Sequence, residues 1–291
     1  MKVDKFRTVI IYIIIILLGL VCLLPLLNIV AISFSSSAAV EGNMVGLIPV
    51  GFSTAAYEKI LEDSQFWHSF LISVERVVLT LIINFVLIVL MAYPLSKTNA
   101  QFRGRNIYAN LMIFAMLFNG GMIPTFLLVK SYGLLNTVWA LVLPGAVPIF
   151  NVILVMNFFA AVPKELEEAA FIDGANPLQV LTKIFIPISK PVLATVSLFS
   201  IVGSWNDFYS GLICMSKAAY YPLMTYIQSL QINVEDLIKQ GNLSAVVDSA
   251  SLGNTNLNAA KIVVAVIPLL LIYPLLQRYF VSGIVVGSVK G

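Results

Sequence analysis

Long uninterrupted runs of apolar residues dominate the chain, and shorter polar segments separate one run from the next. The first run, residues 9–32, carries no charge over 24 positions, enough for a helix to cross a bilayer core of about 30 Å. The pattern predicts six membrane-spanning helices, at residues 9–32, 70–92, 107–129, 137–160, 190–212 and 261–282. We therefore expect an all-α polytopic membrane protein whose whole chain, 1–291, forms a single transmembrane domain.

The first run also raises the alternative of a cleaved secretory signal, because basic residues precede it. The apolar core of such a signal is only about 7–15 residues long. Residues 9–32 exceed that length. We therefore expect a retained first span.

The distribution of Lys and Arg predicts the orientation of the spans. With the N-terminus inside, eleven basic residues fall in inner segments and four in outer ones. The eleven are Lys2, Lys5, Arg7, Lys97, Arg103, Arg105, Lys164, Lys183, Lys190, Arg278 and Lys290, and the four are Lys59, Lys130, Lys217 and Lys239. Because basic residues are enriched on the cytoplasmic side, both termini are predicted to be cytoplasmic.

The composition excludes several classes of function. The chain is 59% hydrophobic and 11% charged, with a net charge of only +3, and its basic residues are too scattered to hold a nucleic-acid backbone. One histidine and two cysteines lack the spacing of a metal site or a disulfide framework. The sequence also lacks a G-x-x-x-x-G-K-[ST] loop, so any nucleotide chemistry must come from a partner.

A polar segment, "EEAAFIDGANPLQVLTKIFIP" at 167–187, lies between the fourth and fifth predicted spans. Pro163 is suited to start a first helix and Gly174 to end it in a left-handed conformation. Asn176 and Pro177 then provide a cap and a first position for a second helix. The sequence thus predicts two short cytoplasmic helices over 163–186 that meet at a tight elbow.

Two interpretations of this segment compete. An amphipathic helix lying on the membrane surface usually carries Lys and Arg on its polar face, to meet anionic lipid. The first helix instead has four acidic residues against Lys164. One of its faces also carries small side chains, since Leu166, Ala169, Ala170 and Asp173 recur at helical spacing. This composition favours docking onto a soluble partner.

The same residues resemble a known family. Glu168-Ala169-Ala170, then Gly174, Ile184 and Ile186-Pro187, resemble the EAA motif of permease subunits of ATP-binding cassette importers, with Ile186 where the family usually has Leu. Three further stretches resemble carbohydrate importers for di- and oligosaccharides: residues 119–159, "SWNDFYSG" at 204–211 and "QRYFVSGIVVGSVKG" at 277–291. Within that branch the chain is most similar to six-span permeases for polysaccharide fragments or glycans.

The resemblance implies an assembly in the bacterial cytoplasmic membrane. A second, different permease would complete the pore, two cytoplasmic ATPase subunits would drive it, and an extracytoplasmic binding protein would deliver the oligosaccharide. ATP and Mg would bind at the ATPase, and this chain would hold no cofactor and catalyse no reaction. ATPase closure would switch the spans between inward- and outward-facing states, through coupling residues Glu168, Ala169, Ala170, Asp173, Gly174, Ala175, Ile184 and Pro187.

Two pairs of residues inside the spans are candidates for the sugar path. Glu75 and Arg76 lie in the second span, where an isolated charge costs about 2.5–3.5 kcal/mol near the bilayer centre. They would either line the path or snorkel to the outer interface, and the second interpretation is favoured. Trp205 and Asn206 combine an aromatic ring with hydrogen-bonding groups, which suits a pyranose, but interhelical packing is the favoured alternative.

Two terminal or loop segments carry weaker expectations. The outer segment 213–260 is long enough to be functional, and in similar subunits it enters the cleft of the binding protein; simple docking is the alternative. The C-terminal "GIVVGSVKG" would reach the ATPase or be a frayed end.

Two other classes of membrane protein fit less well than an importer subunit. A secondary carrier is expected to have intramembrane acids for ion coupling and inverted repeats, yet only Glu75 and Asp207 lie deep and no repeat is evident. A membrane-embedded enzyme is expected to have paired His, Asp or Glu within the spans, and His68 lies outside them.

Overall fold

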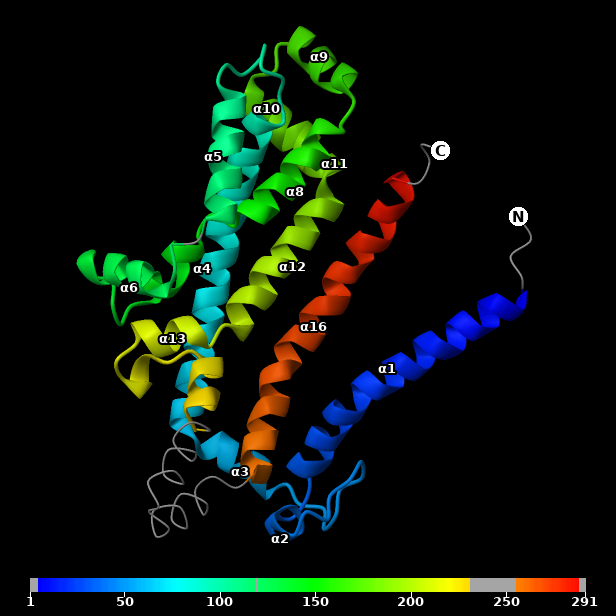
Figure 1. The fold of residues 1–291 in the computed structure, drawn as a ribbon, viewed down its shortest axis with the longest axis vertical. Helices are drawn as coiled ribbons and strands as arrows, with labels where there is room; N and C mark the ends of the chain where they lie inside the picture. Colours follow the sequence, from blue (N-terminus) through cyan, green and yellow to red (C-terminus); the bar gives the residue numbers. More distant parts are fainter. Residues whose placement is uncertain (1–4, 119, 231–254, 288–291) are drawn as a thin grey trace. The chain divides into compact units, whose positions relative to one another are not determined.

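The computed structural model describes residues 5–118, 120–230 and 255–287, and every regular element in these ranges is helical (Figure 1). The chain divides into two compact units, Met1–Trp67 with Tyr226–Pro268 (unit 1) and His68–Thr225 with Leu269–Gly291 (unit 2). The centre of the outer segment, 231–254, and the last four residues lie outside the described ranges. The roles predicted for that segment and for the C-terminal tail therefore stay predictions.

Three helices are long and apolar enough to cross a membrane: α1 (Lys5–Ser33), α4 (Ser64–Leu95) and α16 (Thr255–Gly287). They cover the first, second and sixth predicted spans. None of the most apolar stretch of α1 is buried against the rest of the described chain.

Three further spans exist if each of three bent helix pairs is counted as one. The pairs are α5 (Arg105–Leu117) with α6 (Met122–Ser131); α7 (Val138–Val142) and η1 (Leu143–Gly145) with α8 (Ile149–Ala160); and the stretch Pro177–Ile188 with α12 (Lys190–Asn206). The described residues therefore contain between three and six candidate spans.

The breaks interrupt helices that the sequence predicted as continuous. Between α5 and α6 the chain passes Gly121, whose φ is 88°, a value at which glycine is unstrained. Pro144 and Pro148 flank the 46° bend between α7 and α8. Proline removes a backbone donor and crowds the preceding turn, and this favours a bend. For the fifth predicted span, 190–212, the predicted C-terminal boundary of the helix is wrong. Helix α12 stops at Asn206, and α13 (Tyr209–Cys214) begins after a short break.

Unit 1 contains α1, α2 (Ser37–Glu41), α3 (Ala55–Glu62) and a buried polar cluster. Lys261 of α16 makes an ion pair with Asp63 at 2.7 Å, and the Tyr226 hydroxyl donates to the same carboxylate at 2.9 Å. Burial raises the pKa of Asp63, but the bonds from Lys261, Phe66 and Tyr226 outweigh it and hold this pKa below its ordinary 3.8. The cluster joins the chain segments on either side of 231–254.

We expect Asp63→Asn to lower the free energy of unfolding of unit 1 by about 3 kcal/mol, because it leaves Lys261 charged and buried. Since the folded pKa of Asp63 is depressed, its stabilising contribution is present above pH 4 and is lost as pH falls through the folded value. Thermal unfolding between pH 7 and pH 3 measures both effects. Exposed Glu62→Gln is the matched control, and a melting temperature equal to wild type for Asp63→Asn would contradict the prediction.

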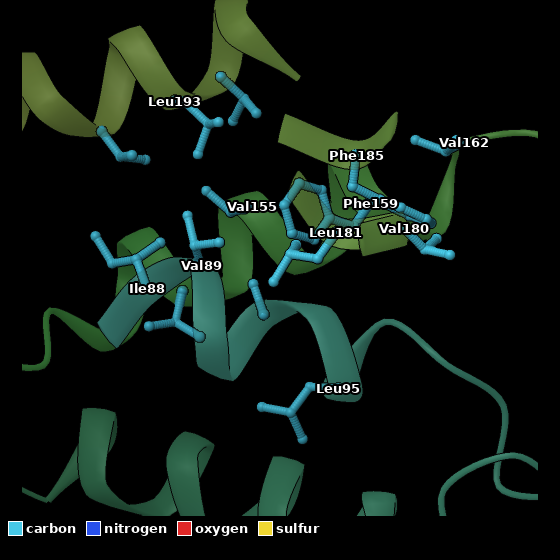
Figure 2. Close-up of a cluster of buried hydrophobic side chains, with 14 of the residues drawn as sticks. Ile88, Val89, Leu95, Val155, Phe159, Val162, Val180, Leu181, Phe185 and Leu193 are labelled. Carbon is cyan, nitrogen blue, oxygen red and sulfur yellow. The ribbon is translucent and has the colours of Figure 1, made fainter. Parts of the chain in front are cut away.

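A hydrophobic cluster forms the core of unit 2, where α4, α8, α12 and the polar segment after α8 meet (Figure 2). Phe185 lies at its centre, with its ring centroid 5.3 Å from that of Phe159 and 5.1 Å from that of Tyr93. The buried members include Ile88, Val89 and Leu95 of α4, Val155 and Phe159 of α8, Val180, Leu181 and Phe185 of the polar segment, and Leu193 of α12. The second half of the predicted elbow is thus part of the core.

Candidate functional site

The elbow has the two helices and the turn that the sequence predicts. Helix α9 (Lys164–Ile172) ends with Gly174 in the left-handed region, at φ 79°. The Gly174 N–H donates to the Phe171 carbonyl at 3.0 Å, and the Ala175 N–H donates to the Ala170 carbonyl at 2.9 Å. These two bonds form a Schellman cap, so the prediction of a left-handed C-terminal cap is confirmed.

The second helix also begins as predicted. Asn176 caps α10 (Pro177–Val180), and the Asn176 and Gln179 side chains each bond the other residue's backbone at 2.9 Å. The helix does not continue as plain α-helix to 186. A π-helical turn, η2 (Leu181–Phe185), precedes α11 (Ile186–Ile188), which contains Pro187. The π turn changes the pairing of backbone hydrogen bonds just before Pro187, whose nitrogen cannot donate one.

The residues of the EAA-like motif divide into an exposed and a packed set. The exposed set is Glu168, Ala169, Asp173, Gly174 and Pro187. The half-buried set, which packs against the core cluster, is Ala170, Ala175 and Ile184. Small side chains at Ala170 and Ala175 therefore let α9 lie close to the chain's own core.

The outer surface of the elbow is apolar and acidic. Ile172 is 86% exposed and Leu178 is 62% exposed, and Leu166 and Phe171 are exposed as well. Glu165 and Glu168 lie among them on α9. Four large apolar side chains gathered on one short segment and bordered by charges are typical of a protein interaction site.

A buried acid that the sequence analysis missed holds the elbow in place. Glu167 is 8% exposed, and its carboxylate accepts a hydrogen bond from the Lys97 ammonium at 2.7 Å and a longer one from the Tyr93 hydroxyl at 3.4 Å. The ammonium also lies 4.1 Å from the Tyr93 ring centroid and 4.2 Å from that of Phe185. The ion pair thus joins α9, which lies at one end of unit 2 (Figure 1), to the segment that follows α4.

Two opposing effects act on the pKa of Lys97. Burial lowers it, while the hydrogen bond and charge of Glu167 raise it. Burial is the larger effect, so the pKa of Lys97 lies below its ordinary 10.5, and the carboxylate limits this fall. Two sequence signals could have found the pair: Glu167 shares a helical stripe with Ala170, three residues on, and Lys97 directly follows a span.

The sequence also missed the partner of Arg76. Its guanidinium is 4% exposed and donates to the Asp207 carboxylate at 2.5 Å and to the Asp207 carbonyl at 2.9 Å. The Asp207 carboxylate accepts in addition from the backbone N–H of Tyr209 and Ser210 at the start of α13. Charges within membrane spans usually pair in this way, so Arg76 does not snorkel with Glu75.

The remaining candidates for the sugar path lie in different surroundings. Trp205 is buried, with its ring edge-on to Phe70 at 5.6 Å, which is the packing that the favoured alternative expected. Asn206 is exposed. Glu75 is exposed and lines a small pocket with His68 and Asn136. The four residues do not form one site.

Comparison with known proteins identifies the family to which the chain belongs. Residues 2–286 match the family described as binding-protein-dependent transport system inner membrane component. The chain belongs to this family. It is accordingly a multi-pass component of the cytoplasmic membrane, as the sequence predicted.

Individual members of the binding-protein-dependent transport family are similar over almost the whole chain. Protein LplC of Bacillus subtilis (strain 168) is 40% identical over 94% of this chain and 91% of its own length. The polygalacturonan/rhamnogalacturonan transport system permease protein YtcP of the same strain is 39% identical over 99% of both. These relatives confirm the resemblance to sugar and polysaccharide permeases.

A solved structure is similar in fold as well as in sequence. It is described as the crystal structure of a bacterial ABC transporter involved in the import of the acidic polysaccharide alginate. One of its chains is 33% identical and superimposes with a TM-score of 0.82, covering 96% of this chain and 98% of its own.

Proposed function

We propose that the chain is a permease subunit of an ATP-binding cassette importer for an oligosaccharide released from a larger polysaccharide. It crosses the membrane six times with both termini in the cytoplasm, and with a second, different permease it forms the translocation path. Two ATPase subunits bind ATP and Mg, and an extracytoplasmic binding protein delivers the sugar. The names of the relatives support the substrate class, and the excess of Lys and Arg in inner segments supports the orientation.

The construction of the elbow is the observation that carries the coupling role. Its exposed face combines Leu166, Ile172 and Leu178 with acidic residues, as expected for a surface that docks onto a soluble protein. Its other face is joined to the membrane helices by the Lys97–Glu167 pair and by Phe185. A push from the ATPase on the exposed face is therefore passed to the spans as a rigid-body movement, which suits alternating access.

Co-purification through a tag on this chain tests the proposal. We expect mass spectrometry of a mild-detergent extract to find a Walker-motif ATPase and a second permease in stoichiometric amounts. Ile172→Arg should lose the ATPase but retain the second permease, because Ile172 is 86% exposed and its replacement leaves the core intact.

Leu61→Arg, an exposed apolar position on α3 of unit 1, is the matched control and should retain both partners. If the wild-type chain is extracted without an ATPase, the importer function is wrong. If Ile172→Arg keeps its ATPase as fully as Leu61→Arg does, the elbow is not the docking surface.

A further inference from the structure

An elongated apolar pocket lies in unit 2 between α4, α5 and the start of α8. Its volume is about 420 Å³, within the range of roughly 300–1,000 Å³ that is usual for ligand pockets. Along α5 it is lined by Tyr108, Leu111, Met112 and Ala115, which recur at helical spacing on one face. These residues extend over about 10 Å of helix, so the pocket suits a chain rather than a compact ring.

The lining of this pocket favours a hydrocarbon ligand. None of the lining residues is charged, and only Tyr108 among them carries a hydroxyl group. Leu90 and Leu111 are 50% and 57% exposed, whereas Leu95 and Met112 are buried. The pocket therefore has an apolar floor and an open side. Because burying an unsatisfied polar group is costly, its ligand must be apolar over most of its length.

Positive charge gathers where α4 leads into α5, next to this pocket. The connecting segment contains Lys97 and Arg103, and α5 begins at Arg105. Lys97 is paired with Glu167, but neither arginine forms an ion pair with a carboxylate of the described residues. The sequence has no Asp or Glu at all from 77 to 164. Two positive charges therefore remain without a neutralising acid nearby in the chain.

The two arginines lie beside one end of the pocket. Phe102 and Tyr108 both line it, and their rings stack with centroids 5.8 Å apart. Arg103 directly follows Phe102 and is exposed. The Arg105 Nε donates to the carbonyl of Leu95, another lining residue, at 3.0 Å. This bond holds the guanidinium near the end of the pocket, and a guanidinium has further N–H donors with which it can bind a phosphate.

An anionic phospholipid matches both parts of this arrangement, since it joins a negative phosphate to long apolar chains. We propose that the pocket binds one acyl chain of an anionic phospholipid of the inner leaflet, and that Arg103 and Arg105 bind its phosphate. Basic residues beside pockets between membrane helices bind anionic headgroups on the cytoplasmic side in this way. The inference rests on the proposed orientation of the chain, which places the segment between α4 and α5 in the cytoplasm, and does not depend on transport.

Native mass spectrometry tests the headgroup contact. The full-length protein, with the partners that it retains, is stripped of lipid and titrated with phosphatidylglycerol or with phosphatidylcholine of the same acyl chains. Wild type should bind phosphatidylglycerol at least fivefold more tightly. Arg103→Gln should weaken that binding about fivefold and leave phosphatidylcholine binding and the melting temperature without added lipid unchanged, because Arg103 is exposed. Lys190→Gln, at an exposed lysine outside the pocket, is the matched control.

A second pair of variants tests the pocket itself. Ala115 and Met116 are both exposed on α5, but only Ala115 lines the pocket. Ala115→Phe should fill the pocket and weaken phosphatidylglycerol binding by about tenfold or more, while Met116→Phe should bind as wild type does.

Each of four results would overturn the inference. Wild type could bind the two lipids equally, Arg103→Gln could match Lys190→Gln, or Ala115→Phe could match Met116→Phe. In the fourth, Ala115→Phe loses a co-purifying permease, which would assign the pocket to a protein neighbour. None of these results bears on the proposed importer function, which the co-purification of an ATPase tests separately.

Discussion

Arg76→Met is expected to lower the free energy of unfolding of unit 2 by about 3 kcal/mol, because it leaves the Asp207 carboxylate without its partner. Arg76 is almost fully buried, and its guanidinium binds both the side chain and the backbone of Asp207. Methionine retains most of the apolar volume, so the loss reports on the charge pair rather than on packing. Thermal unfolding of the purified protein in detergent measures it.

A double variant makes this prediction sharper. Asp207→Asn keeps an oxygen that can accept from Tyr209 and Ser210 but removes the charge. Arg76→Met combined with Asp207→Asn should therefore recover most of the stability that Arg76→Met alone loses. Arg103→Met, at an exposed arginine, is the control. The ion pair would have no stabilising role if Arg76→Met melted at the control's temperature.

Glu167→Gln is expected to reduce uptake by about tenfold or more, because Lys97 is left charged and buried and the attachment of α9 is weakened. Without the carboxylate the pKa of Lys97 loses the interaction that opposes its fall on burial. The expected loss of stability is about 3 kcal/mol, since one partner of a buried pair is removed. Uptake in proteoliposomes and the melting temperature of the complex measure the two effects.

The matched control for this prediction lies on the same helix. Glu165→Gln removes an exposed carboxylate of α9 and should change neither stability nor the attachment of the elbow. Glu167→Gln combined with Lys97→Met removes both charges and should restore most of the melting temperature. Wild-type uptake by the single variant would show that the pair does not position the elbow.

Features that depend on neighbouring residues were predictable from the sequence. Gly174 and the Asn176-Pro177 pair act within one turn of their own helix ends, so local rules of helix capping place them correctly. The lengths of the long runs likewise located α1, α4 and α16. These features need no knowledge of what lies across the fold.

Features that depend on distant residues were not predictable in the same way. Lys97 and Glu167 are 70 positions apart, and Arg76 and Asp207 are 131 apart. Spacing along one helix says which residues share a face, but not which residue of another helix faces them. The sequence therefore identified Arg76 as a charge in need of a partner, but it marked Asp207 only as a deep carboxylate and did not connect the two.

The π turn at 181–185 determines how an added or missing residue in this stretch affects the elbow. Each residue of an α-helix turns its successors by about 100°, and a π turn accommodates one residue more than an α turn does. A homologue that lacks one residue here would run on as plain α-helix and still present α9 at nearly the same azimuth to the core, because the wider turn takes up the extra residue within a single turn. The π turn thus lets the segment before Pro187 differ in length by one residue without changing the direction in which the elbow points.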